Sequence, residues 1–119
     1  MKEKLLDKSN YFRGLLVLIR KTRKIRREEA SMIMRVGKRL GFAIDFCKNA
    51  IRELLENPNI SNEPPKFYNK NTAKEFLNDG IRLTVVDKHI DPSEVKWLKA
   101  VATKNNVDWN SYKSKLKIN

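Results

Sequence analysis

The chain has little of the residue types that mark several classes of protein. Cys47 is its only cysteine, which excludes an internal disulfide and fits a reducing compartment, so we expect a cytoplasmic protein. Cys47 lies inside an apolar helical pattern, which favours a small buried side chain over a nucleophile. His89 is the only histidine, and CxxC, HExxH and glycine-rich phosphate-loop motifs are missing. The sequence therefore indicates neither an enzyme nor a cofactor.

Long apolar runs are also lacking. The longest, GLLVLI at 14–19, is too short to span a membrane and is flanked by charge, so we expect neither a membrane span nor a targeting segment. Glycine and proline occur four times each, which leaves room for long uninterrupted helices. A length of 119 residues suits one domain, 1–119, with a single hydrophobic core.

Positive charge is abundant. The formal net charge is +12, and a bias of this size favours acidic partners through long-range attraction. The densest part is RKTRKIRR at 20–27, with six positive charges in eight residues.

Apolar residues recur with a helical period in two halves of the chain. A shift of 65 residues superimposes the halves: Leu18 falls on Leu83, Ile33 on Leu98 and Val36 on Val101. The helix stop at Gly41 falls on Asn106, and both residue types accept a left-handed backbone. We predict an all-α fold with six to seven helices, arranged as two pseudo-repeated three-helix units in one bundle. Unit one covers about 10–56, a connector 57–71, and unit two about 72–117.

Two helix starts in the second unit carry capping signals. Thr72 and Glu75 are spaced as a capping box, and so are Asp91 and Glu94, with Pro92 at the first helical position between them. The connector before them holds three prolines and five asparagines, and it could pack across the two units or form an exposed docking loop.

The segment VVDKHIDPSEVKWLKAVA at 85–102 resembles the tellurite-resistance TerB-like family of small helical domains. Asp87, Ile90 and Glu94 match the family's acidic turn, while Lys88 stands where glycine is usual. The resemblance implies an acidic surface that binds metal, with Asp87, Asp91 and Glu94 as the candidate ligands. A capping box already explains Asp91 and Glu94, which weighs against that site.

The first unit departs from this family pattern. Thr22 and Arg23 replace Asp87 and Lys88, and only Glu29 keeps its counterpart, Glu94. We expect a basic patch here that binds a partner, formed by Arg20, Lys21, Arg23, Lys24, Arg26, Arg27, Arg35, Lys38 and Arg39. The alternative is a solvated turn with no partner.

The partner favoured by the sequence is an acidic protein, engaged by a non-enzymatic adaptor. Non-specific nucleic-acid binding is the first alternative, because lysine and arginine neutralise phosphates. The segment 43–56 is too poor in basic residues for a recognition helix. A cation-responsive protein is the second alternative. Membrane binding is disfavoured, since it needs exposed apolar residues beside the charge, and Leu15, Leu16 and Ile19 are expected in the core.

Overall fold

The computed structural model describes residues 2–20, 25–57, 59, 61–86 and 90–116. Within these residues all regular structure is helical and no strand occurs, which confirms the all-α prediction. The described elements are α1 (Lys2–Arg20), α2 (Arg27–Leu40), α3 (Ile44–Glu56), α4 (Lys70–Val85), α5 (Pro92–Lys104), α6 (Asn110–Lys113) and a 3₁₀ turn at Ser114–Leu116. None of the described helices is both long and apolar enough to cross a membrane.

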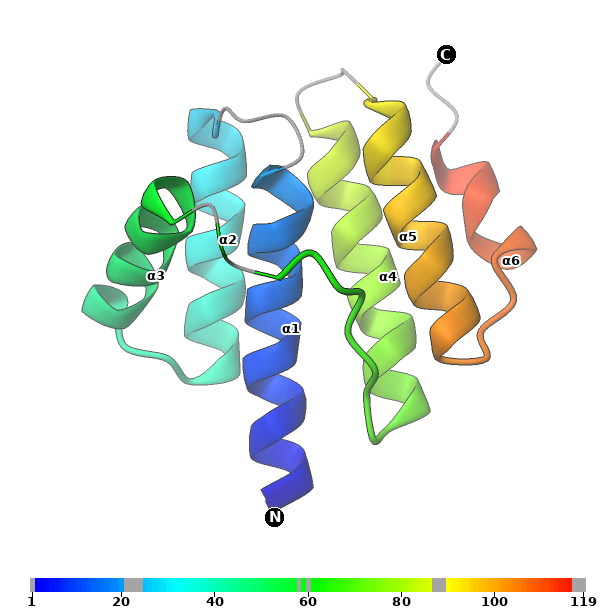
Figure 1. The fold of residues 1–119 in the computed structure, drawn as a ribbon, viewed down its shortest axis with the longest axis horizontal. Coiled ribbons are helices and arrows are strands. Elements are labelled where there is room, and N and C mark those ends of the chain that lie inside the picture. Colours follow the sequence, from blue (N-terminus) through cyan, green and yellow to red (C-terminus); the bar gives the residue numbers. More distant parts are fainter. Residues whose placement is uncertain (1, 21–24, 58, 60, 87–89, 117–119) are drawn as a thin grey trace.

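The helices lie side by side in the order α3, α2, α1, α4, α5 and α6 (Figure 1). α1 and α4 occupy the centre and run in the same direction, and α2 and α5 run back against them. Unit one (α1–α3) therefore lies on one side of the contact between α1 and α4, and unit two (α4–α6) lies on the other. The buried core fills the space between these layers and includes Leu15, Leu18, Phe76, Leu83 and Leu98.

The 65-residue repeat extends to helix ends and hydrogen bonds. α1 ends at Arg20 and α4 at Val85, which is the same position after the shift. Gly41 and Asn106 both have positive φ, 93° and 56°. The residue after each stop closes back on the helix in the same way. Phe42 N donates to the Gly37 carbonyl at 2.9 Å, and Val107 N donates to the Ala102 carbonyl at 2.9 Å. These repeated stops confirm the pseudo-repeat.

Equivalent residues of the two units meet where α1 packs on α4. Tyr11 and its counterpart Phe76 contact edge to face, with ring centroids 5.3 Å apart. Gly14 lets the Phe76 ring approach so closely that a Cβ at Gly14 would lie 2.8 Å from it. The residue equivalent to Gly14 is Asp79, which accepts a hydrogen bond from the Tyr11 hydroxyl. The contact of Phe76 with Gly14 is thus apolar, whereas the equivalent contact of Tyr11 with Asp79 is polar.

Two predicted helix starts are wrong. α1 begins at Lys2, eight residues before the expected residue 10, because its first turns consist of good helix formers although they lack a buried apolar stripe. α4 begins at Lys70 and not at Thr72. Its N-cap is Asn69, whose side chain accepts hydrogen bonds from the backbone N–H groups of Asn71 and Thr72 at 2.8 and 3.4 Å.

The connector packs across both units and does not form a free loop. On the side of unit two, Trp97 Nε1 donates to the Asn62 carbonyl at 2.7 Å. Asn105 donates to the Pro65 carbonyl at 2.9 Å and accepts from Phe67 N at 2.8 Å. On the side of unit one, both carboxylate oxygens of the buried Asp7 accept backbone N–H groups, from Tyr68 at 2.9 Å and from Asn69 at 3.1 Å. Of the two readings left open by the sequence, the structure supports packing.

Candidate partner-binding surface

α2 exposes three cations along one face, and we refer to Arg27, Arg35 and Lys38 as the α2 row. Their spacing of eight and three residues puts them on one side of the helix, over a length of about 16 Å. All three side chains are exposed. No carboxylate of the described residues forms an ion pair with any of them. The row is therefore a surface of net positive charge available to a partner.

A buried carboxylate stabilises the start of α2 beneath this charge. Glu29 is almost fully buried in the first turn and accepts a hydrogen bond from Arg26 N at 3.0 Å. A carboxylate at this position favours the helix dipole, which the neighbouring Arg26 and Arg27 oppose. Glu29 thereby lets the helix begin with two arginines, which keeps Arg27 in the α2 row.

The described residues of the predicted basic patch do not all lie on one surface. Arg20 points to the connector, where its guanidinium donates to the Asn57 carbonyl at 3.5 Å and to the side chain of Asn62. The Arg20 guanidinium therefore forms hydrogen bonds within the chain, to the connector. Lys21, Arg23 and Lys24 lie outside the described residues.

Arg39, at the end of α2, belongs to a three-residue network with α1 and α4. Its Nη2 atom donates to Asp79 Oδ2 at 2.6 Å and lies 3.3 Å from the Tyr11 hydroxyl. The Tyr11 hydroxyl donates to the same Asp79 oxygen, and Arg82 lies 3.8 Å from the other one. Tyr11 and Asp79 are 1% and 5% exposed, so this pair is shielded from water, whereas the side chains of Arg39 and Arg82 reach the solvent.

The electrostatics of this network hold Tyr11 neutral and Arg39 charged. Burial, reinforced by the hydrogen bond to Asp79, raises the pKa of Tyr11 well above its ordinary range, so the hydroxyl stays a donor. The hydrogen bond to Asp79 also raises the pKa of Arg39. Because Arg39 is half exposed, it presents charge to solvent while it also joins α2 to the central helices.

An open groove of about 840 Å³ adjoins Arg39. It lies between the first half of α1, the end of α2 and the start of α4. Its cations are Lys4, Lys8, Arg39 and Lys70, while the carboxylate of Asp7 is occupied by the connector backbone. The rest of its lining includes Tyr11, Tyr68 and Glu75. This second basic surface was not predicted from the sequence.

Two of the three predicted metal ligands, Asp91 and Glu94, lie in the described residues, and both are at the start of α5. Asp91 caps α5, where its Oδ1 accepts from Ser93 N at 2.8 Å, and Glu94 is buried in the first turn of that helix. Asp87 lies outside the described residues. In the part of the chain that the structure describes, no group of three or more histidine, cysteine, aspartate or glutamate side chains could hold a metal ion.

Of the two reactive side chains noted in the sequence, Cys47 lies in the described residues. Cys47 is 1% exposed, as predicted, and burial raises the pKa of its thiol, which disfavours the nucleophilic thiolate. His89 lies outside the described residues.

Sequence reasoning missed the two carboxylates that organise the structure. Asp7 precedes Tyr11 by one helical turn, and Asp79 follows Phe76 by three residues, so both lie on the apolar stripes of their helices. A carboxylate on such a stripe is expected to be buried with hydrogen-bond donors. That spacing was the available signal.

Comparison with protein-family models, with curated proteins and with solved structures finds no match to the chain.

Proposed function

We propose that this chain is a non-enzymatic binding module of the TerB-like type, which acts in the cytoplasm and engages an acidic partner through the α2 row. The observation that supports it is the exposed, unneutralised row of Arg27, Arg35 and Lys38 on one helix face. Exposed charge of one sign accelerates and orients the encounter with an oppositely charged partner. The second unit offers a rigid support through the network of Arg39 with Asp79.

An acidic protein segment suits this surface better than duplex DNA. A row of three cations over about 16 Å matches a short acidic helix or strand, whereas duplex binding commonly neutralises about six to ten phosphates. α3 also lacks the character of a recognition helix. Its first turn exposes Ile44 and Phe46, where a helix that enters the major groove presents polar and basic side chains.

Fluorescence anisotropy tests the proposal with three labelled probes: an acidic peptide of glutamate and aspartate, a random duplex and an RNA of similar length. The test variant is Arg27→Glu with Arg35→Glu and Lys38→Glu. The matched control is Lys96→Glu with Lys99→Glu and Lys113→Glu, which changes the net charge equally at exposed positions on α5 and α6.

We expect the parent to bind the acidic peptide with an affinity that falls as salt rises. Three exposed charge pairs at about 0.5 kcal/mol each correspond to about tenfold in affinity, and reversal adds repulsion, so the test variant should lose about tenfold or more. The control should lose much less. Equal losses of affinity in both variants would mean that only net charge matters, which would refute the α2 row as the binding surface. Stronger binding to duplex or RNA would make nucleic acid the partner.

A further inference from the structure

The exposed apolar side chains gather at one end of the bundle. Among the described residues, the large hydrophobic side chains that remain exposed are Leu5, Leu6, Ile44, Phe46 and Tyr68. They come from the start of α1, the start of α3 and the connector just before α4. Figure 1 shows the start of α1 and the connector before α4 at the lower end of the molecule, and the start of α3, which is the lower end of that helix, higher up on the left flank. The opposite end, where α2 and α5 begin, has no counterpart in the described residues.

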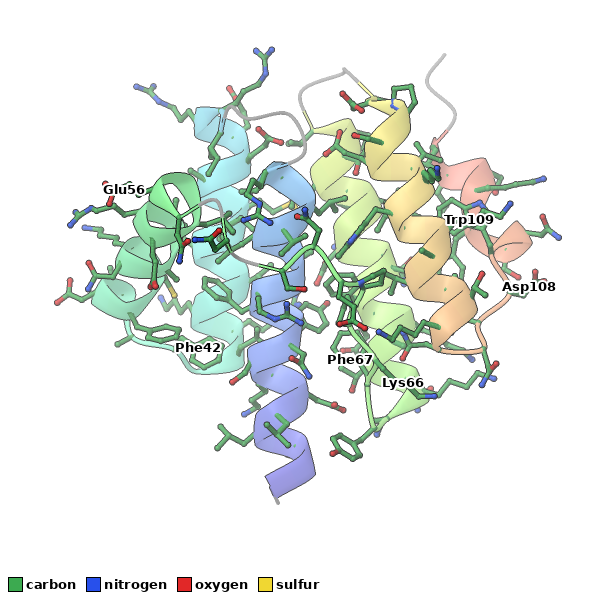
Figure 2. The ribbon with its side chains drawn as sticks, viewed as in Figure 1. Phe42, Glu56, Lys66, Phe67, Asp108 and Trp109 are labelled. Atoms are coloured by element: carbon green, nitrogen blue, oxygen red, sulfur yellow. The ribbon has the colours of Figure 1, made fainter. Side chains whose placement is uncertain are left out.

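The start of α1 is the projecting part of this apolar end. The first turns of α1, which carry Leu5 and Leu6, project beyond the turn between α2 and α3 and beyond the start of α4 (Figure 1). Figure 2 shows Phe42 at the α2–α3 turn and Lys66 on the connector, on either side of α1. Phe46 is 52% exposed although its ring lies 5.1 Å from that of Phe42. A projecting apolar tip is suited to penetrate the headgroup region of a bilayer.

Cations surround the apolar end. The exposed or half-buried lysines on these segments and at the adjoining end of α2 are Lys4, Lys8, Lys38, Lys48, Lys66 and Lys70. The main carboxylate of the projecting helix, Asp7, is buried and holds the connector backbone. Among the side chains that the structure describes, Asp45 and Glu75 are the exposed acids close to this end. Lysines and apolar side chains that share one surface are typical of proteins that bind anionic bilayers.

We propose that this end docks on an anionic membrane surface, with Leu5, Leu6, Ile44 and Phe46 in the headgroup region and the surrounding lysines on the lipid phosphates and carboxylates. The sequence disfavoured a membrane because it showed no exposed apolar residues beside charge, and the fold supplies them at this end. Self-association through the same end is opposed, because it would bring two groups of lysines together with fewer exposed carboxylates, Asp45 and Glu75, beside them. The proposal is independent of the proposed function, since the bound orientation leaves most of the α2 row in solvent.

Vesicle flotation tests this proposal with vesicles of phosphatidylcholine alone and with vesicles that contain about one-third phosphatidylserine. The apolar variant is Leu5→Ser with Leu6→Ser and Ile44→Ser. The charge variant is Lys4→Glu with Lys8→Glu and Lys70→Glu, and its matched control is the Lys96→Glu, Lys99→Glu, Lys113→Glu protein. Far-ultraviolet circular dichroism and urea unfolding establish that each variant folds, which is expected because every substituted side chain is exposed or half exposed.

We expect the parent to float with anionic vesicles and not with phosphatidylcholine vesicles. The apolar variant should bind about tenfold or more weakly, and the charge variant about fivefold weaker per lysine, as about 1 kcal/mol for each basic residue implies. The α5–α6 control should bind nearly as the parent does. A variant with Arg27→Glu and Arg35→Glu, the two α2-row residues that are not among the lysines around the apolar end, should also retain flotation, which separates this proposal from the proposed function.

Three results would overturn the proposal. One is no flotation of the parent with anionic vesicles. Another is an apolar variant that floats as well as the parent, which would indicate adsorption by charge alone. The third is a parent that dimerises in analytical ultracentrifugation and an apolar variant that does not, without flotation of either, which would assign the apolar end to a second copy of the chain.

Discussion

Asparagine in place of Asp79 removes one buried charge where α1, α2 and α4 meet and keeps the shape of the side chain. The parent carboxylate accepts hydrogen bonds from the buried Tyr11 hydroxyl and from Arg39. A hydrogen bond to a charged group contributes about 1.5–3 kcal/mol, and a neutral one about 0.5–1.5 kcal/mol. Loss of the charge therefore costs about 1–1.5 kcal/mol at Tyr11. It costs less at Arg39, whose side chain is 54% exposed and screened by solvent. We expect Asp79→Asn to lower the free energy of unfolding by about 2 kcal/mol.

Urea unfolding at neutral pH, followed by tryptophan fluorescence, measures this change, because Trp97 is buried in the folded protein and Trp109 is half buried. Tyr11→Phe and the double variant complete a thermodynamic cycle. A coupling energy of about 1 kcal/mol or more between Tyr11 and Asp79 is expected for two groups in direct contact. Coupling near zero, or a loss for Asp79→Asn below about 0.5 kcal/mol, would show that water solvates the carboxylate and that our burial argument is mistaken.

Three further perturbations test other parts of the structure. Burial and Asp79 raise the pKa of Tyr11, so its contribution to stability is complete below the ordinary tyrosine pKa of about 10 and is lost as pH rises above it. Urea unfolding between about pH 9 and pH 11 should therefore show a steeper loss for the parent than for Tyr11→Phe, and parallel losses would contradict this. Gly14→Ala should destabilise the protein by about 1–2 kcal/mol in thermal or urea unfolding, because the added Cβ would lie 2.8 Å from the buried Phe76 ring. A more stable variant, as the better helix propensity of alanine alone would give, would refute that close contact. Asn105→Ala should lower the free energy of unfolding in urea by about 2–4 kcal/mol, because it leaves the buried Phe67 N–H without its acceptor. Hydrogen exchange at the Phe67 amide should become faster in this variant, and an unchanged rate would show that Asn105 does not protect this amide.

The architecture was accessible to sequence reasoning because its signals are local and occur twice. Gly41 and Asn106 stop helices through their own backbone preferences, and Asp91 caps α5 through a residue two positions away. An apolar period repeated after 65 residues then joins these local signals into two units. Helix type, helix order and the buried position of Cys47 all follow from such short-range information.

The errors arose where distant residues decide the outcome. The start of α4 depends on Asp7, which is more than 60 residues away and binds the backbone of Tyr68 and Asn69. Arg20 was assigned to the basic patch because its neighbours in sequence are basic, yet its acceptors lie 37 and 42 residues further along the chain. The grouping of Leu5 with Phe46 at one end requires the relative placement of α1 and α3, which no periodicity within either helix contains.

The unequal contacts of Tyr11 with Asp79 and of Phe76 with Gly14 have a consequence for how the two halves recognise each other. A pair of first halves would bring two tyrosine hydroxyls to the centre with glycine in place of the carboxylate, and both hydroxyls would be buried without an acceptor. A pair of second halves would bury two aspartates without Arg39, whose counterpart Lys104 is bound to the connector at Glu63 and Pro64. Each half is therefore complementary to the other and mismatched with itself. If the chain were divided within the connector, the two fragments should reassemble as one-to-one heterodimers. The polar contact of Tyr11 with Asp79 would then disfavour both symmetric pairs.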